Sequence, residues 1–199
     1  GFELNYSGEF ARVFGNWNLG LNADFTSPNF AINFFGFGNN SSNPNATKDD
    51  LDFNRVRIGK LTFGSSLNWL GNLGAKIELG VEYQNFQIEN TSGRFINTAY
   101  KSDNAVFTSQ KFINTEASYH FENKNNKTYA TNGMQTDLKI GYTTNLENNN
   151  KFGYIVPSIS FDQKLNANGK LVFATKMHSH FTFGNGYEFY QAASIGGNK

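Results

Sequence analysis

"AKIELGVEYQ", residues 75–84, decides the fold because two kinds of side chain alternate along it. A period of two is typical of a β-strand that has one apolar and one polar face. The odd positions carry the apolar side chains, and the even positions carry charged or polar ones around a single glycine: Ala75, Ile77, Leu79, Val81 and Tyr83 against Lys76, Glu78, Glu82 and Gln84.

The same alternation recurs along almost the whole chain of 199 residues. It predicts eight consecutive strands joined by turns rich in Asn and Gly, with no helical pattern. Each strand has roughly 10–14 residues, whereas soluble strands have ~5–6 and tilted transmembrane strands need ~9–11. We therefore predict an all-β fold, an antiparallel transmembrane β-barrel with apolar side chains toward lipid and polar side chains toward the lumen.

The composition agrees with a wall that is apolar on one side and wet on the other. Aromatic residues make up 16% of the chain, although its mean hydropathy is −0.51. The net charge of +1 gives no field that would attract nucleic acid. The absence of cysteine excludes disulfides and thiolate metal sites. No run approaches the ~20 apolar residues of a membrane helix, and no signal peptide is visible.

The lengths of the connections alternate, as in outer-membrane barrels with short periplasmic turns and long external loops. We treat residues 1–199 as one partial barrel with external loops near 27–50, 90–108 and 184–199. The apolar parity switches between Ile58 and Leu61, which predicts a bulge near Gly59. Pro157 predicts a bulge or an edge position in the seventh strand. Aromatic side chains near strand ends predict interfacial girdles: Phe10, Phe14, Trp17, Trp69, Tyr83, Phe121, Phe152 and Tyr187.

"GKLVFATKMHSHFTFGNG", residues 169–186, places two histidines two positions apart. They would lie roughly 6.5–7 Å apart along a strand, a loose spacing for one metal ion. We therefore interpret His178 and His180 as lumen wall rather than as a metal or proton-transfer site. The full set predicted to face the lumen is Glu78, Glu82, Glu116, His120, Asp137, Lys139, Lys176, His178 and His180.

The sequence offers no catalytic constellation, because it has no nucleophile elbow, phosphate loop or HExxH motif. We expect no enzyme activity in this chain and no cofactor. The "FGFG" stretch lacks the third glycine and the following helix of a phosphate cradle, so we interpret it as an external loop. The predicted external-loop residues are Phe35, Gly36, Phe37, Gly38, Gly196 and Gly197.

Three stretches carry a resemblance to a known family. "FTSPNFAINFFGFGNNSSN" (residues 25–43), "DFNRVRIG" (52–59) and "YEFYQAASIGGNK" (187–199) resemble the barrel of the BamA/TamA-type outer-membrane assembly superfamily, in its Bacteroidetes-like form. The last stretch is similar to the start of that family's sixth external loop, just before its Arg-Gly-Tyr/Phe signature.

The resemblance implies a sixteen-stranded barrel in the bacterial outer membrane, of which this chain would be a fragment holding strands four to eleven. It implies insertion or export of other proteins, or anchoring of an upstream phosphoesterase or patatin-like domain. The implied partners are outer-membrane lipid and lipopolysaccharide, together with other outer-membrane proteins or lipoproteins. Two alternatives remain open: a complete eight-stranded barrel acting as porin, adhesin or structural protein, and a soluble lipocalin-like binder.

Overall fold

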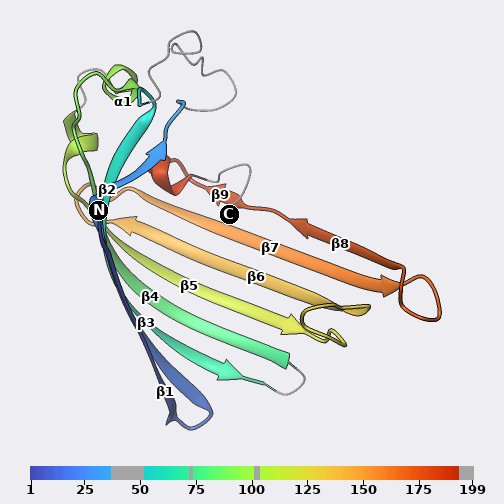
Figure 1. Ribbon diagram of the computed structural model, residues 1–199. Coiled ribbons are helices and arrows are strands. Elements are labelled where there is room, and N and C mark those ends of the chain that lie inside the picture. Colours follow the sequence, from blue (N-terminus) through green and yellow to red (C-terminus); the bar gives the residue numbers. More distant parts are fainter. Residues whose placement is uncertain (37–51, 72–73, 101–103, 193–199) are drawn as a thin grey trace.

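The chain forms one curved antiparallel sheet. The computed structural model describes residues 1–36, 52–71, 74–100 and 104–192 (Figure 1). Neighbouring strands pair in chain order, and the all-β fold is confirmed. The strands are β1 (Glu3–Phe14), β2 (Trp17–Asn33), β3 (Arg55–Leu70), β4 (Ala75–Ile88), β5 (Gln110–Glu122), β6 (Asn132–Asn145), β7 (Lys151–Lys164), β8 (Val172–His178) and β9 (Phe181–Phe183).

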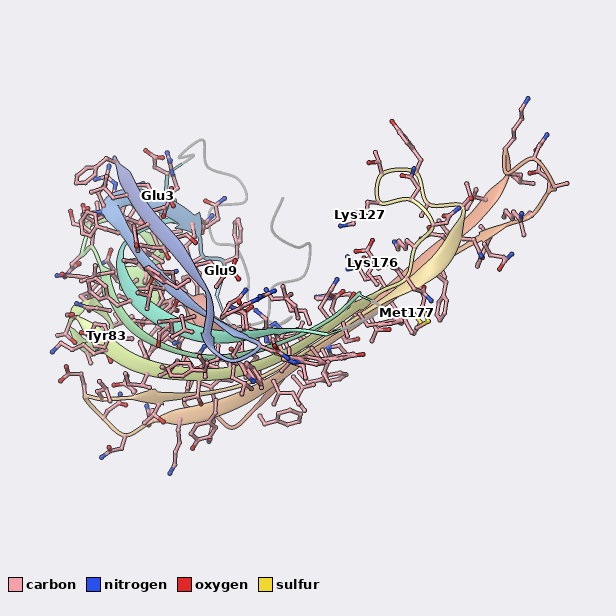
Figure 2. The ribbon with its side chains drawn as sticks, turned by 90° about the horizontal axis from the view of Figure 1, so that it is seen from below. Glu3, Glu9, Tyr83, Lys127, Lys176 and Met177 are labelled. Carbon is pink, nitrogen blue, oxygen red and sulfur yellow. The ribbon has the colours of Figure 1, made fainter. Side chains whose placement is uncertain are left out.

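The convex face of the sheet is apolar. Along β4 and β5, Leu79 pairs with Ala117 and Tyr83 with Ile113, so the apolar parity continues from strand to strand. Leu4, Phe63 and Met177 on this face are 63%, 52% and 71% exposed, which is unfavourable in water and suits contact with lipid. Figure 2 shows Lys176 and Met177, neighbours on β8, pointing to opposite faces.

The concave face is polar over most of its length, since it carries the even parity of β4 and its paired positions. A lipocalin-like binder needs the reverse arrangement, with apolar side chains lining the concave face. The structure therefore contradicts that alternative.

The bulge predicted near Gly59 lies in the neighbouring strand instead. The β3–β4 register runs unbroken from Ile58 to Leu70. The β2–β3 register shifts between Thr26 and Phe30, where residues 27–29 stand opposite Gly59 alone. The apolar parity of β3 changes because Val56 and Ile58 face a covered part of the concave side, as described below.

The prediction of a bulge or edge position at Pro157 is wrong. Pro157 pairs with Leu138 in an unbroken β6–β7 register, and β7 also has neighbours on its other side. Proline lacks an N–H, so the ladder on that other side is interrupted opposite it. The predicted eighth strand is thereby divided into β8 and β9, and Ser179 N–H still donates to the Pro157 carbonyl at 3.1 Å.

The long connections gather at one end of the sheet, with short turns at the other (Figure 1). β2 continues to Asn33, well into the segment predicted as loop. The connection after β4 contains α1 (Phe95–Ala99) and η2 (Asn104–Phe107), and η3 (Phe189–Gln191) follows β9, so the prediction of no helix is wrong. In the described part of the chain, no helix is long and apolar enough to cross a membrane.

The two outer strands leave the sheet open. Among the described residues, β1 pairs with β2 and β8 with β7, and the two do not pair with each other. The eight-stranded alternative requires that pairing, so nothing in this structure favours it.

Candidate functional site

The concave face holds a polar site that β4, β5, β6 and β7 build together. Their register places Glu82 beside Asn114, and Glu116 beside Gly141, which in turn pairs with Tyr154. Because every second residue of each strand points the same way, these side chains converge on one hollow of about 320 Å³. Its other charged members are Glu78 and Lys139.

Glu116 is the centre of this hollow. Its Oε2 accepts a hydrogen bond of 2.6 Å from the Tyr154 hydroxyl, and its Oε1 lies 3.0 Å from Lys139 Nζ. The Tyr154 hydroxyl also lies 3.3 Å from Asn114 Oδ1. Gly141 makes this arrangement possible, because a Cβ atom there would collide with the Tyr154 ring. One carboxylate is thus satisfied by a cation and a phenol on two neighbouring strands.

Glu82 forms a second, smaller cluster beside the first. It accepts hydrogen bonds from Asn22 Nδ2 at 3.2 Å and from Gln84 Nε2 at 2.5 Å. Asn22 belongs to β2, so this contact reaches across β3, where Gly64 leaves room for the Asn22 amide. Lys76 Nζ lies 3.1 Å from Glu78 on the same face.

A third cluster lies toward the short-turn end. His120 Nδ1 is 2.6 Å from Asp137 Oδ1, and Gln135 Nε2 donates to the other oxygen of Asp137 at 2.8 Å. His120 Nε2 is 3.8 Å from Glu122. Lys124 and Asp162 form a further ion pair at 3.0 Å.

The structure brings together only part of the predicted lumen-facing set. Glu116 contacts Lys139 directly, and His120 contacts Asp137. Glu78 and Glu82 line the same hollow as Glu116. Lys176, His178 and His180 share this face but lie on exposed positions of β8 and the break after it.

His180 has one ring contact with this site, an edge-to-face arrangement with Tyr154 at 6.0 Å between centroids. Among the described residues, no group of three His, Asp or Glu side chains is placed to hold a metal ion.

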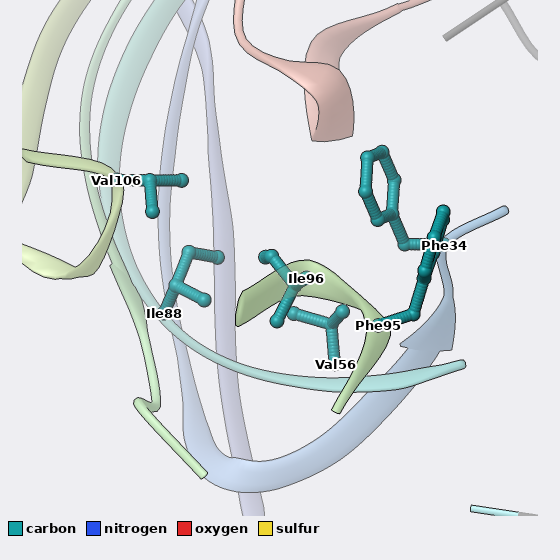
Figure 3. Close-up of a cluster of buried hydrophobic side chains, with 6 residues drawn as sticks. All are labelled: Phe34, Val56, Ile88, Phe95, Ile96 and Val106. Atoms are coloured by element: carbon teal, nitrogen blue, oxygen red, sulfur yellow. The ribbon is translucent and has the colours of Figure 1, made fainter. Parts of the chain in front are cut away.

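An apolar roof, which the alternation along the strands does not predict, covers the same face at the long-loop end (Figure 3). We use "roof" for the buried cluster Phe34, Val56, Ile88, Phe95, Ile96 and Val106. Phe95 and Ile96 belong to α1, so the predicted external loop 90–108 folds onto the concave face. The apolar parity of Val56 and Ile58 was the available signal.

The segment after β9 extends the roof. Phe189 lies 4.8 Å from the Phe34 ring and Tyr190 lies 4.8 Å from the Phe86 ring, measured between centroids. Burial, with Glu188 nearby, raises the pKa of Tyr190 above its ordinary value. Among the described residues, nothing accepts a hydrogen bond from the buried Tyr190 hydroxyl.

Two of the aromatic residues predicted for interfacial girdles lie elsewhere. Phe152 is buried on the concave face, and Tyr187 packs against it at 5.9 Å between centroids. Of the predicted external-loop residues, Phe35 and Gly36 lie just after β2, with Phe35 half exposed. Phe37, Gly38, Gly196 and Gly197 lie outside the described residues.

The arrangement suits a wall between lipid and water. Its convex side offers hydrocarbon contact, while its concave side pairs charges in a hollow wide enough for solvent. Neutralised carboxylates and shared donors keep such a polar face stable without a second layer of protein.

Comparison with known proteins places this wall in a defined class of barrel. No family model and no curated protein matches the sequence. Among solved structures, the chain is similar to the crystal structure of BamA from Haemophilus ducreyi lacking POTRA domains 1–3, with a TM-score of 0.69 and 18% identity. The match covers 98% of this chain and 36% of that chain. The fold is therefore that of part of a BamA-type barrel.

Proposed function

We propose that this chain forms part of the wall of an outer-membrane barrel whose whole protein inserts or exports other outer-membrane proteins. The observation that carries the proposal is the match of 98% of the chain to a stretch of BamA. The distribution of side chains supports it, since the convex face is apolar and the concave face carries paired charges.

The proposal places the long-loop end outside the cell and the short turns in the periplasm, as in other outer-membrane barrels. The partners are then outer-leaflet lipid, including lipopolysaccharide, and other outer-membrane proteins or lipoproteins. Membership of the BamA/TamA-type superfamily, in its Bacteroidetes-like form, is part of this proposal. Anchoring of an upstream domain is the form the function takes if assembly of other barrels does not depend on this protein.

Depletion of the intact protein in its own bacterium tests the function. We expect several unrelated outer-membrane barrels to fall together when their abundance is measured by quantitative mass spectrometry, and to recover with a wild-type copy. Loss of a single surface protein would replace assembly with anchoring. Recovery of the protein in a soluble fraction would overturn the outer-membrane proposal itself.

Two substitutions on β4, three positions apart, test which face meets lipid. Val81 lies on the convex face and Gln84 on the concave face of β4. Val81→Arg should destabilise the inserted barrel by about 2–4 kcal/mol, the penalty of a lipid-facing cation near the bilayer midplane. Gln84→Arg adds the same charge toward water and should leave the heat-modifiable folded band unchanged. Equal effects of the two would contradict the assignment of the faces.

A further inference from the structure

The lipid-facing parity of β3 changes its chemistry at the long-loop end. Leu61 and Phe63 belong to the apolar convex face, but beyond Gly59 the positions of the same parity are Arg57 and Arg55. Their side chains are 46% and 55% exposed. Arg94, which immediately precedes α1, lines the same pocket of about 100 Å³, together with Ala31 and Asp52.

Three guanidinium groups share this place with two carboxylates. Arg55 Nη1 lies 2.9 Å from Asp52 Oδ1 and Arg94 Nη2 lies 3.7 Å from Asp52 Oδ2. Arg57 Nη1 lies 3.3 Å from Glu89 Oε1. Each guanidinium carries five N–H donors, so these contacts leave donors for a further anion. The hydrogen bond from Arg55 lowers the pKa of Asp52, as the excess of positive charge requires.

A second hollow lies next to the arginines on the same face, toward the short-turn end of the sheet. Its volume is about 430 Å³, and Phe25, Pro28, Gly59 and Leu61 form its apolar part. Asn85, Gln87 and Glu89 line its polar part. The hollow lies where the β2 bulge stands opposite Gly59, which has no side chain of its own, and Pro28 of the bulge lies within ordinary contact of a Cβ built at Gly59.

We propose that these two hollows bind one phosphorylated glycolipid of the outer leaflet, of the lipid A type. Its phosphate binds Arg55, Arg57 and Arg94, and one of its acyl chains lies over Phe25 and Leu61. The inference rests on the proposed function, which puts this end of the barrel at the outer leaflet.

Geometry and charge both fit this ligand. Arginine forms paired hydrogen bonds with phosphate oxygens in a fixed planar arrangement. Arg57 and Leu61 are separated by about 13 Å along the strand, which takes a lipid from its headgroup level into the hydrocarbon.

Native mass spectrometry of the intact protein, released from detergent with added lipid A, tests this site. Wild-type protein should retain bis-phosphorylated lipid A. It should not retain a lipid A preparation from which the phosphates have been removed. Arg57→Gln combined with Arg94→Gln should weaken retention about tenfold or more, the size expected when charge-assisted hydrogen bonds to phosphate are lost. Arg57→Lys should keep part of the retention that the glutamine variant loses, because the charge remains.

Lys111→Gln is the matched control. Lys111 is a cation near the same end, 45% exposed and paired with Glu147 at 2.7 Å. Its loss should leave retention unchanged. Gly59→Leu should weaken retention without changing any charge, because the leucine fills the apolar hollow. The folded state of each variant is checked by its heat-modifiable migration.

Two results would overturn the inference: equal retention by all variants, or an equal loss in Lys111→Gln. Either result from a protein that resides in the outer membrane leaves the proposed function intact. Absence of the protein from the outer membrane would overturn the proposed function, and the proposed binding of lipid A would fall with it.

Discussion

The concave face has two regions that share strands and parity but differ in chemistry. On β3, Val56 is 2% exposed within the roof, whereas Thr62, three positions further along the same face, is 0% exposed and donates a hydrogen bond to Asp24 at 3.2 Å. The first region excludes water because a loop covers it. In the second region Thr62 is buried as well, but it stays polar because Asp24 on the neighbouring strand accepts its hydrogen bond.

The difference teaches what alternation reports. It reports contrast between two environments, lipid against water, and not the identity of a strand face. Where a loop folds back onto β3, the concave positions Val56 and Ile58 become apolar while the convex positions Arg55 and Arg57 are charged, so the contrast is inverted. A change of apolar parity within one strand can therefore mean a change of neighbour, with no irregularity in the strand itself.

The largest expected effect comes from removing the centre of the roof. Ile96 on α1 is 1% exposed, so Ile96→Ala should destabilise the folded barrel by about 2–4 kcal/mol through lost burial and a cavity. Limited proteolysis should then cut residues 89–109 sooner. Leu146→Ala, at an exposed position of the same end, is the control. Equal resistance of the two variants would mean that the roof does not hold this loop.

The corresponding test of the polar region is Gly141→Ala. The added methyl group displaces the Tyr154 ring and breaks its hydrogen bond to Glu116, which should cost about 1–3 kcal/mol. Gly153→Ala is matched, because its Cβ would meet only ordinary contacts at 3.5 Å and beyond. Unfolding by denaturant in detergent measures both. A larger loss in Gly153→Ala would contradict the described packing of Tyr154.

A reciprocal exchange on β3 compares the two regions directly. Val56→Thr buries a hydroxyl within the roof and should cost about 1–3 kcal/mol. Thr62→Val removes the donor to Asp24 and should cost about 0.5–1.5 kcal/mol. Thermal unfolding measured in one detergent gives both values. Destabilisation by neither variant would mean that the two regions do not differ in the polarity they accept at a buried position of β3.

The smallest effect is expected at Tyr190. Tyr190→Phe removes a buried hydroxyl without a hydrogen-bond partner among the described residues, and should stabilise the roof by about 1 kcal/mol. Its pKa is raised in the folded state, so folding favours the protonated phenol. The stability that comes from keeping the phenol protonated is fully present below the unfolded pKa of about 10. It is lost as the pH rises above that value.

Wild-type protein should therefore lose stability above about pH 10 more steeply than Tyr190→Phe does, in thermal melts taken across that range. Identical slopes for the two proteins would show that Tyr190 is not buried.

Most of the strand framework could be predicted from sequence because a strand's two faces are a local property. The alternation within residues 75–84 shows which of their side chains share a face, and the structure keeps that parity from β4 into β5. Tyr154 could not be assigned in this way. β7 carries apolar residues on both faces near Pro157, so its parity is hidden until Gly141 is seen opposite the tyrosine.

The roof could not be predicted because it depends on contacts between distant parts of the chain. Phe95 N–H donates to the Phe53 carbonyl at 2.8 Å, which joins two connections that are separate in sequence. Nothing local in "RFINTA" says that its apolar residues meet β3 rather than solvent. The clusters of the concave face were partly accessible, since Glu116 and Lys139 lie on predicted polar parities, but their cross-strand pairing required the register.

The contact between Phe34 and Phe189 has a consequence for the order of folding. Phe34 directly follows β2 and Phe189 lies after β9, and their ring centroids are 4.8 Å apart. Hairpins form between neighbours in sequence, whereas this contact closes a loop that contains β3 to β9. The entropic cost of closing that loop becomes small only after the intervening strands have paired. The pair is therefore a late event, and quenching between probes at these two positions would time the completion of the sheet.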